Sequence, residues 1–169
     1  FVEKFNIPTV PGYSKDLPDD ESKLKKIVNE IGYPIILKAT AGGGGRGMRV
    51  VTNENDLLDS LRITKQEALN AFGNDKVYIE KFIQKPRHIE VQIVGDGKGN
   101  AIHLGTRDCS LQRRHQKIIE EAPALDLDVD NLNILLDACV NLCKEISYEG
   151  AGTLEFLYEN KEFYFIEMN

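Results

Sequence analysis

The spacing of apolar side chains changes several times along the chain, and each spacing predicts a secondary-structure element. Around residues 24–31, 57–72 and 132–146 apolar side chains recur every three to four positions, which predicts helices with one buried face. Candidate cap residues precede the first two helices: Asp19 or Asp20, and Thr52 or Asn53. The third helix is expected to bury one apolar stripe: Leu132, Leu135, Leu136, Cys139, Val140, Cys143 and Ile146.

Strands are predicted where apolar residues run together or alternate with polar ones. Short apolar runs at 35–39, 48–51 and 77–83 predict strands in the first half of the chain. Residues 88–94 alternate between polar and apolar, which predicts an antiparallel strand with one buried face. The remaining strands are expected at 101–104, 153–158 and 163–168. The fold class predicted from this order of elements is α+β.

The first half of the chain alternates predicted strands and helices, whereas the second half begins with strands of alternating polar and apolar residues. The boundary between these two parts is expected near residues 82–86. We expect an extended N-terminal segment over 1–12, a small α+β unit over 13–83 and a second unit over 84–169. The chain starts without methionine and stops inside an apparent strand, so we expect it to be part of a longer protein.

A glycine-rich stretch, 42–47, joins two of the predicted strands. Glycine exposes backbone N–H groups and adopts dihedrals that other residues avoid, so such a stretch can fold closely around phosphates. The Walker pattern is excluded because Met48 and Arg49 stand where Lys and Ser/Thr are required, and the dinucleotide fingerprint requires a helix to follow. We favour a phosphate-binding flap, mobile without nucleotide and aided by the cations Lys38 and Arg46, over a hairpin without a ligand.

Composition limits the functional classes. A net charge of −6 disfavours general nucleic-acid binding. No apolar run approaches membrane-spanning length and no signal peptide is visible, so no membrane partner is expected. Three cysteines without a Cys-x-x-Cys motif give no disulfide framework and are typical of a reducing compartment, so we expect the cytoplasm.

None of the three cysteines is expected to be a catalytic nucleophile. Cys109 lies near His115 in sequence, but nothing orients the pair, so we disfavour a thiol nucleophile. Cys139 and Cys143 share the apolar face of a predicted helix and are expected in the core.

The stretch 107–117 carries four cationic residues and one histidine, and we expect it to be a loop between strands. A solvated charged face is one interpretation. Anion binding is the other, and we favour it because Gln112, His115 and Lys117 are donors of different kinds that a rigid scaffold could hold together.

Glu155 and Glu167 interrupt predicted strands that are otherwise apolar. Facing carboxylates destabilise a sheet unless a cation lies between them, and two carboxylates with substrate phosphates commonly hold Mg²⁺. The alternative is that one or both face solvent. A regular hairpin turning at 160–161 would put them on opposite faces, so we predict a bulge or a three-residue loop that pairs them and brings Asn169 to the same face.

Motifs spread over nearly the whole chain form one set: Lys38-Ala39 with Gly42 to Met48, Glu80-Lys81, Pro86 to Glu90, Arg107 to Ser110 with Gln112 to Lys117, Glu120 to Pro123, Gly150 to Thr153, and Phe165 to Asn169. Together they closely resemble the ATP-grasp core of biotin carboxylase, the ATP-using component of biotin-dependent carboxylases. The resemblance implies an α+β ATP-grasp fold, with a glycine-flap lid subdomain and a truncated antiparallel-sheet C-terminal subdomain.

The resemblance also implies roles for particular residues. The ATP phosphates would be held by Lys38, Gly44 and Gly45. The adenine would contact Glu80, Lys81, Phe82, Ile83 and Leu157, of which the first four also lie at the expected boundary. The nucleotide site would be completed by His88, Gln112 and His115. Mg²⁺ or Mn²⁺ would be bound by Glu155, Glu167 and Asn169, and bicarbonate by the catalytic residue Lys117.

For the longer protein, the resemblance implies that ATP activates bicarbonate as carboxyphosphate and that biotin on a carrier is then carboxylated. The implied partners are a biotin carboxyl carrier domain, a carboxyltransferase component and a second copy in a homodimer. Two arginines that follow Asn169 in the family and an N-terminal lysine lie outside this sequence, so we expect the fragment to be inactive alone.

Other functions stay open at this point. The chain could belong to another ATP-grasp ligase, such as a carbamoyl-phosphate synthetase half, or be a nucleotide-binding fragment without catalysis. The stretch 107–117 with Lys117 favours the carboxylase. The acyl acceptor, whether acetyl-CoA, propionyl-CoA or pyruvate, is not determined by this sequence.

Overall fold

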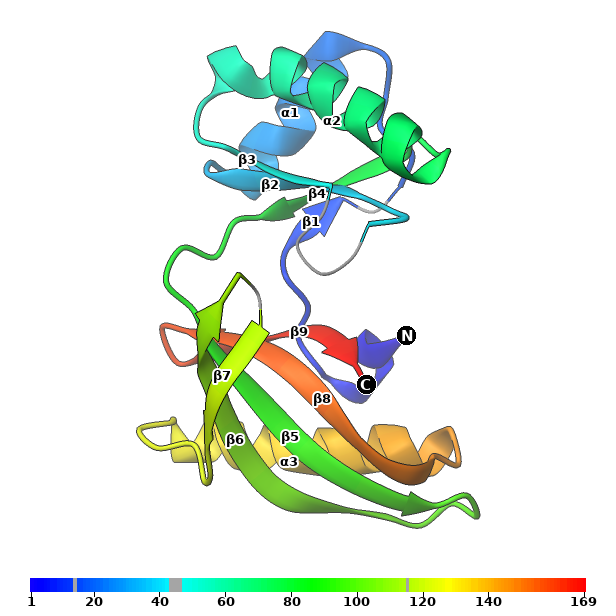
Figure 1. Cartoon of the computed structure of the whole chain (residues 1–169), viewed down its shortest axis with the longest axis vertical. Helices are drawn as coiled ribbons and strands as arrows, with labels where there is room; N and C mark the ends of the chain where they lie inside the picture. The colour runs from blue at the N-terminus through cyan, green and yellow to red at the C-terminus, as the bar shows by residue number, and fades with distance from the viewer. Residues whose placement is uncertain (14, 43–46, 115) are drawn as a thin grey trace. The chain divides into compact units, whose positions relative to one another are not determined.

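The computed structural model describes residues 1–13, 15–42, 47–114 and 116–169. The chain divides into two compact units (Figure 1). Unit 1 comprises Phe1–Val10 with Ile83–Asn169, and unit 2 comprises Pro11–Phe82. Three of the predicted site residues, Gly44, Gly45 and His115, lie outside the described residues, as does most of the predicted flap.

Unit 2 is a four-stranded antiparallel sheet with two helices. Its elements are β1 (Gly12–Tyr13), α1 (Glu21–Ile31), β2 (Ile35–Ala39), β3 (Met48–Val51), the 3₁₀ helix η2 (Glu54–Asp56), α2 (Leu57–Phe72) and β4 (Val77–Lys81). The strand order is β1-β4-β2-β3. The helices pack on the sheet around one apolar core, which is made by Leu24, Val28, Ile35, Leu37, Val51, Leu57, Leu61, Val77 and Ile79.

The helix starts of unit 2 follow from local capping. The Asp20 side chain accepts a hydrogen bond from the backbone N–H of Lys23, so the predicted cap of α1 is confirmed. Asn53 also caps, but its side chain accepts from Asn55 and Asp56 at the start of η2 rather than of α2. A 3₁₀ turn therefore precedes the second helix, a common arrangement at helix N-termini.

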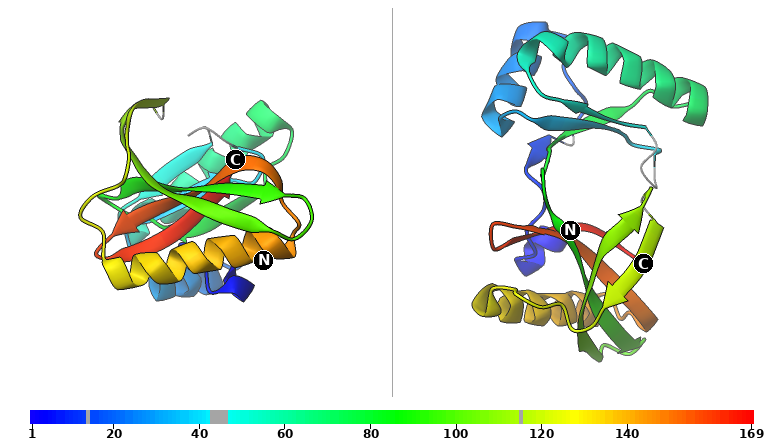
Figure 2. Two further views of the ribbon diagram at one scale, coloured as in Figure 1. Left: turned by 90° about the horizontal axis from the view of Figure 1, so that it is seen from below. Right: turned by 60° about the vertical axis from the view of Figure 1, so that its left-hand side comes forward.

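Unit 1 is a five-stranded antiparallel sheet covered on one face by a long helix (Figure 2). Its elements are the 3₁₀ helix η1 (Val2–Phe5), β5 (Arg87–Asp96), β6 (Ala101–Arg113), β7 (Gln116–Glu121), α3 (Val129–Glu145), β8 (Glu149–Glu159) and β9 (Glu162–Met168). The strand order is β7-β6-β5-β8-β9. Cys139 and Cys143 of α3 are fully buried, which confirms their predicted place in the core, whereas Ile146 caps the helix and is exposed.

The N-terminal residues are not the separate extended segment that the sequence suggested. Residues 2–5 form η1, and residues 1–10 cluster with unit 1. Ile7 is buried in the unit 1 core, and the N–H of Phe165 in β9 donates to the carbonyl of Pro8. Burial of this apolar side chain, which no local pattern announces, attaches the segment to a sheet more than 80 positions away in sequence.

The prediction of a cationic loop over 107–117 was also wrong. Strand β6 continues as far as Arg113, and β7 pairs back on it in antiparallel fashion, with register shifts between Asp108 and Gln112. The segment carries too few apolar residues to show strand alternation, yet backbone pairing needs no particular side chain. These charged residues therefore lie on a defined hairpin.

The register of the last hairpin confirms the prediction. Glu159 pairs with Glu162 across a two-residue turn, and a shift beyond Phe156 pairs Glu155 with Glu167. Because Phe156 pairs with Phe165, one extra residue in β9 makes the bulge. The bulge reverses the side-chain alternation and so sets Glu155 opposite Glu167.

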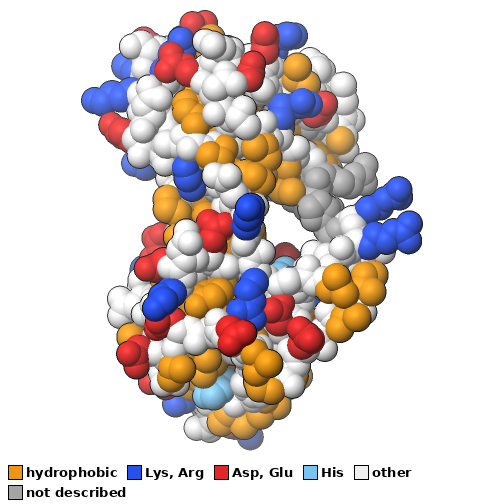
Figure 3. All heavy atoms as spheres, turned by 90° about the vertical axis from the view of Figure 1, so that its left-hand side faces the viewer, with side chains coloured by type: hydrophobic (Ala, Val, Ile, Leu, Met, Phe, Trp, Pro, Cys, Tyr) orange, Lys and Arg blue, Asp and Glu red, His pale blue; other side chains and the backbone are white. Residues whose placement is uncertain are grey.

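The surface is mixed in charge. Among the described side chains on the face drawn in Figure 3, acidic, basic and hydrophobic groups alternate rather than gather into a single basic area. Within the described residues, no helix is long and apolar enough to cross a membrane.

Candidate functional site

The alternation of β5 separates an apolar face from a polar one. Ile89, Val91 and Ile93 are fully buried in the core that includes α3. His88 and Glu90, which alternate with them, therefore project from the opposite face of the sheet. Strand β8 pairs Glu155 directly with Glu90, so two carboxylates stand side by side there.

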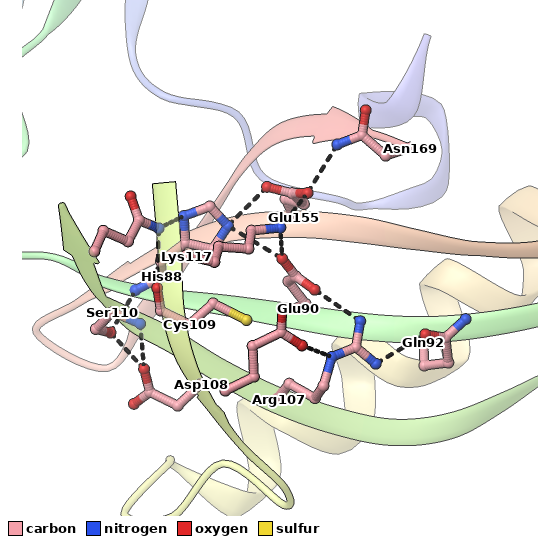
Figure 4. A network of polar contacts seen from close by, with 12 residues as sticks. His88, Glu90, Gln92, Arg107, Asp108, Cys109, Ser110, Lys117, Glu155 and Asn169 are labelled. Atoms are coloured by element: carbon pink, nitrogen blue, oxygen red, sulfur yellow. Dashed lines mark hydrogen bonds and ion pairs between the residues drawn. The ribbon is translucent and has the colours of Figure 1, made fainter. Parts of the chain in front are cut away.

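Lys117 of β7 reaches this pair of carboxylates (Figure 4). Its ammonium group donates to Glu90 Oε1 and, at 2.9 Å, to Glu155 Oε1. The side chains of Glu90 and Glu155 are only 2% and 3% exposed, so each requires a compensating positive charge. The cation that facing carboxylates need is thus supplied by the protein itself.

The charges in this cluster stabilise each other. Burial works against the ammonium form of Lys117, but hydrogen bonds and attraction from Glu90 and Glu155 outweigh it and raise the pKa of Lys117. Burial likewise raises the pKa of Glu155, but hydrogen bonds from Lys117 and Asn169 and the nearby Lys117 charge leave that pKa below its ordinary value. Lys117 is therefore a cation, and Glu155 an anion, across the physiological range.

Arg107 of β6 completes the shell around Glu90. Its guanidinium group donates to Glu90 Oε2 at 2.8 Å and to Gln92 Oε1 at 2.8 Å, and Nε lies 3.1 Å from a carboxylate oxygen of Glu120. Sequence reasoning assigned no role to Glu90 or Arg107. The available signal was the alternation His88-x-Glu90, which puts Glu90 on the same face as a predicted site residue.

His88 lies at one end of the cluster and is held from both sides. Its Nε2 is 2.7 Å from Glu155 Oε2 and 3.6 Å from Glu90 Oε1, but the angles do not make an aligned hydrogen bond at Nε2. Its Nδ1 is 3.0 Å from the side-chain nitrogen of Gln112. The structure thus brings together His88, Gln112, Lys117 and Glu155 from the predicted set.

The predicted metal ligands are arranged in part around Glu155. Asn169 donates from Nδ2 to Glu155 Oε1 at 2.8 Å, while Glu167 lies across the hairpin from Glu155 and is exposed. Carboxylate and amide oxygens are the donors that Mg²⁺ prefers, so this set fits that ion. Donor atoms of His88, Glu90 and Glu155 also lie within 4.8 Å of one another, but Lys117 takes an oxygen from each of the two carboxylates.

Within unit 2, Lys38 of β2 pairs with Glu80 of β4. Its Nζ is 2.6 Å from Glu80 Oε2 and 5.8 Å from the centre of the Tyr78 ring. Lys81 donates from Nζ to the carbonyls of Gly32 and Tyr33, each at 2.9 Å. The side chains of Glu80 and Lys81 therefore have partners within unit 2, and the contact of residues 80–83 with adenine stays a prediction, as does that of Leu157.

Cys109 is fully buried, and burial together with the neighbouring carboxylates of Glu90 and Glu120 raises the pKa of its thiol to about 12. Nucleophilic cysteines react as thiolates, so this environment works against such a role, as the sequence argument expected.

Comparison with known proteins identifies the family. Residues 1–169 match the family described as "Carbamoyl-phosphate synthase L chain, ATP binding domain". The chain is 58% identical to the biotin carboxylase of Pseudomonas aeruginosa, over 99% of this chain and 37% of that protein. The chain therefore belongs to the carbamoyl-phosphate synthase L chain ATP-binding domain family, and it spans little more than a third of the length of the Pseudomonas aeruginosa biotin carboxylase.

Solved structures agree. The β,γ-ATP complex of Campylobacter jejuni biotin carboxylase has a TM-score of 0.87 and 54% identity, and covers 99% of this chain and 38% of that one. The biotin carboxylase domain of Hydrogenobacter thermophilus 2-oxoglutarate carboxylase, in complex with MgADP, ADP and bicarbonate, has a TM-score of 0.86 and 47% identity, and covers 99% of this chain and 37% of that one. The fold is the α+β ATP-grasp fold, and the resemblance to biotin carboxylase drawn from the sequence is confirmed.

Proposed function

We propose that this chain supplies ATP- and bicarbonate-handling residues to a biotin carboxylase. The complete protein would use ATP to convert bicarbonate into carboxyphosphate and then carboxylate biotin on its carrier. One observation carries the proposal: Lys117 is a permanently charged ammonium group held between two buried carboxylates, in a chain 47% identical to a domain whose structure contains MgADP and bicarbonate.

Lys117 is the group we assign to bicarbonate and to its charge during the reaction. A preorganised cation stabilises negative charge as it develops and needs no reorganisation at the moment of reaction. Glu90 and Glu155 keep the lysine protonated and fix its position, which a free surface lysine lacks. The lysine thus contributes as a fixed positive charge rather than as a base.

For the nucleotide, we propose the residues implied by the sequence resemblance. Lys38, Gly44 and Gly45 would bind phosphates, and Glu80, Lys81, Phe82, Ile83 and Leu157 would contact adenine. His88, Gln112 and His115 would complete the site, with Glu155, Glu167 and Asn169 as ligands of Mg²⁺ or Mn²⁺. The bound metal would neutralise phosphate charge, which is its usual part in phosphoryl transfer. Residues 13–83 would act as the lid, which excludes water that would hydrolyse carboxyphosphate.

The proposal extends to partners of the longer protein. Carrier-bound biotin must reach the site, so a biotin carboxyl carrier domain and a carboxyltransferase component are the expected partners, with a homodimer as the assembly. The cytoplasm is the proposed location. The acyl acceptor is decided by residues outside this chain.

The test uses the full-length protein and measures ADP release that depends on both bicarbonate and biotin. Lys117→Gln is expected to reduce kcat on the order of 10²-fold, as removal of a preorganised charged group does. Lys98→Gln is the matched control, because Lys98 lies in the exposed turn between β5 and β6. Full activity of Lys117→Gln would contradict the assignment of Lys117.

The family description supplies the competing function, a carbamoyl-phosphate synthase. The same assay separates the two by its second substrate. Stimulation by biotin supports the carboxylase, whereas stimulation by ammonia with no effect of biotin would replace it with the synthase.

A further inference from the structure

A second polar cluster lies behind His88, on β5 and β6, and has no part in the proposed chemistry. The carboxylate of Asp108 accepts hydrogen bonds from the backbone N–H of Ser110, at 2.9 Å, and from its hydroxyl group. Its other oxygen accepts from Arg87, whose Nε is 2.9 Å away, and the same guanidinium group donates to the carbonyl of Leu125 at 2.6 Å. Asp108 is thus tied to its own strand, to β5 and to the segment before α3.

This cluster ends the pairing of β5 with β6. The last backbone pair is Ile89 with Asp108, and the next N–H, that of His88, donates to the hydroxyl oxygen of Ser110 at 2.9 Å. The Ser110 proton is already directed at Asp108, so the oxygen is left as the acceptor that His88 needs. Asp108 therefore decides which way the Ser110 hydroxyl group points.

Beyond Asp108, strand β6 is bulged, and the bulge brings Gln112 back to His88. The Gln112 side-chain nitrogen donates to the carbonyl of Cys109 at 2.9 Å. A carbonyl oxygen can only accept, so the atom facing it must be the NH₂ group. The same NH₂ group lies 3.0 Å from His88 Nδ1, which makes Nδ1 the acceptor. In the neutral ring the proton then resides on Nε2, the nitrogen 2.7 Å from Glu155.

We propose that Asp108 is a positioning residue for His88. Acting through Ser110 and the β6 bulge, it holds the imidazole ring as the Nε2–H tautomer, a fixed hydrogen-bond donor on the side of Glu155. The significance for activity rests on the proposed function, in which His88 contacts the nucleotide. A donor set in advance interacts with an anionic oxygen without first having to reorient.

The test reads the tautomer directly, by long-range ¹H–¹⁵N spectra of the histidine rings in the full-length protein. The His88 signals are those lost in His88→Gln. Ser110→Ala removes the acceptor for His88 N–H, and Ser110→Thr keeps a hydroxyl group there. Asp108→Ala removes the carboxylate that binds Ser110 and Arg87. Asp96→Ala is its control, because Asp96 accepts hydrogen bonds from Lys98 and Asn100 at the other end of the same hairpin.

In the unmodified chain, Ser110→Thr and Asp96→Ala, we expect the separated Nδ1 and Nε2 resonances of an Nε2–H ring. In Ser110→Ala and Asp108→Ala, this separation is expected to collapse toward a tautomer average, while the amide spectrum stays dispersed. An unchanged His88 pattern in folded Ser110→Ala would overturn the proposal. If Asp108→Ala does not fold, Ser110→Ala decides alone, because it leaves the pair of Arg87 and Asp108 in place.

The kinetic arm uses the full-length protein. Ser110→Ala is expected to lower kcat/KM for ATP about tenfold and Ser110→Thr less than about twofold, since small displacements of positioned groups have effects of this order. No ATP-dependent activity in the unmodified protein would overturn the proposed function, while the tautomer spectra would still test the positioning role. Equal kcat/KM in Ser110→Ala and Ser110→Thr would overturn the link to activity.

Discussion

Two lysine sites, one in each unit, show different ways of holding a cation. Lys38 of unit 2 has a single carboxylate partner, Glu80, and the two side chains are 18% and 22% exposed. Lys117 of unit 1 has two partners, Glu90 and Glu155, which are almost completely buried while the lysine itself is 30% exposed. In the first site both charges reach water; in the second only the lysine does.

The difference matters when a ligand competes for the lysine. If Lys38 turns to a phosphate, Glu80 can recover hydration, so little is lost. Glu90 and Glu155 cannot, because leaving a buried carboxylate without a donor is costly. Each has a second donor: Arg107 for Glu90 and Asn169 for Glu155. If Lys117 turned toward an anion, each buried carboxylate would therefore keep one hydrogen-bond donor.

The largest effect is expected when Lys117 and the second donor of Glu90 are removed together. The double variant Arg107→Met with Lys117→Met leaves Glu90 without a cation, which should cost unit 1 about 4 kcal/mol of unfolding free energy. The measurement is hydrogen exchange of β5 and β8 amides, which reports on unit 1 alone. The two single variants should sum to clearly less than the double. Simple additivity within about 0.5 kcal/mol would mean that the two donors do not substitute for each other.

Single removal of each lysine compares the sites directly. Lys117→Met is expected to cost unit 1 about 2 kcal/mol, because hydrogen bonds from a charged group to buried carboxylates are lost. Lys38→Met should cost unit 2 about 1 kcal/mol or less, because Glu80 reaches water. Exchange of β5 amides reports the first and exchange of β2 amides the second. Equal losses would remove the distinction between the sites.

Acid should weaken unit 1 through Glu155. The folded pKa of this carboxyl lies below its ordinary value of 4.5, so its contribution is fully present above pH 4.5 and is lost as pH falls through the folded pKa. The titratable groups facing it are Lys117, His88, Glu90 and Glu167. We expect the free energy of unfolding of unit 1 to fall over this acid range, and hydrogen exchange of the β8 amides measures the loss. The variant Glu155→Gln should lack this component, and an unchanged acid profile in that variant would show that other carboxyls cause the loss.

The smallest effect concerns the ring beside Lys38. Tyr78→Leu keeps an apolar side chain and removes the cation–π contact, so it should cost unit 2 about 0.5 kcal/mol. Exchange of β4 amides measures it, and Tyr78→Phe, which keeps a ring, is the control. A loss as large in Tyr78→Phe would assign the effect to the hydroxyl group instead.

Much of the fold is encoded locally and was predicted from the sequence. The start of α1 depends on Asp20 and residues just beyond it, and Cys139 and Cys143 share an apolar stripe within one helix. The β8–β9 register follows from carboxylate positions within a single hairpin, so the bulge that pairs Glu155 with Glu167 was also predicted. In each case the deciding residues lie within about a dozen positions of one another.

The sequence predictions were wrong where a residue's environment is set by partners far away in the sequence. Alternation alone gives Glu90 a solvent-facing position, yet it is buried because Arg107 and Lys117 approach from strands 17 and 27 positions further along. The side chains of residues 107–113 show no strand pattern. These residues form part of β6 because β5 and β7 pair with its backbone. A charge is buried only where distant partners compensate for its desolvation, so the sequence determined which residues could form the site, and only the tertiary structure decided which charges it encloses.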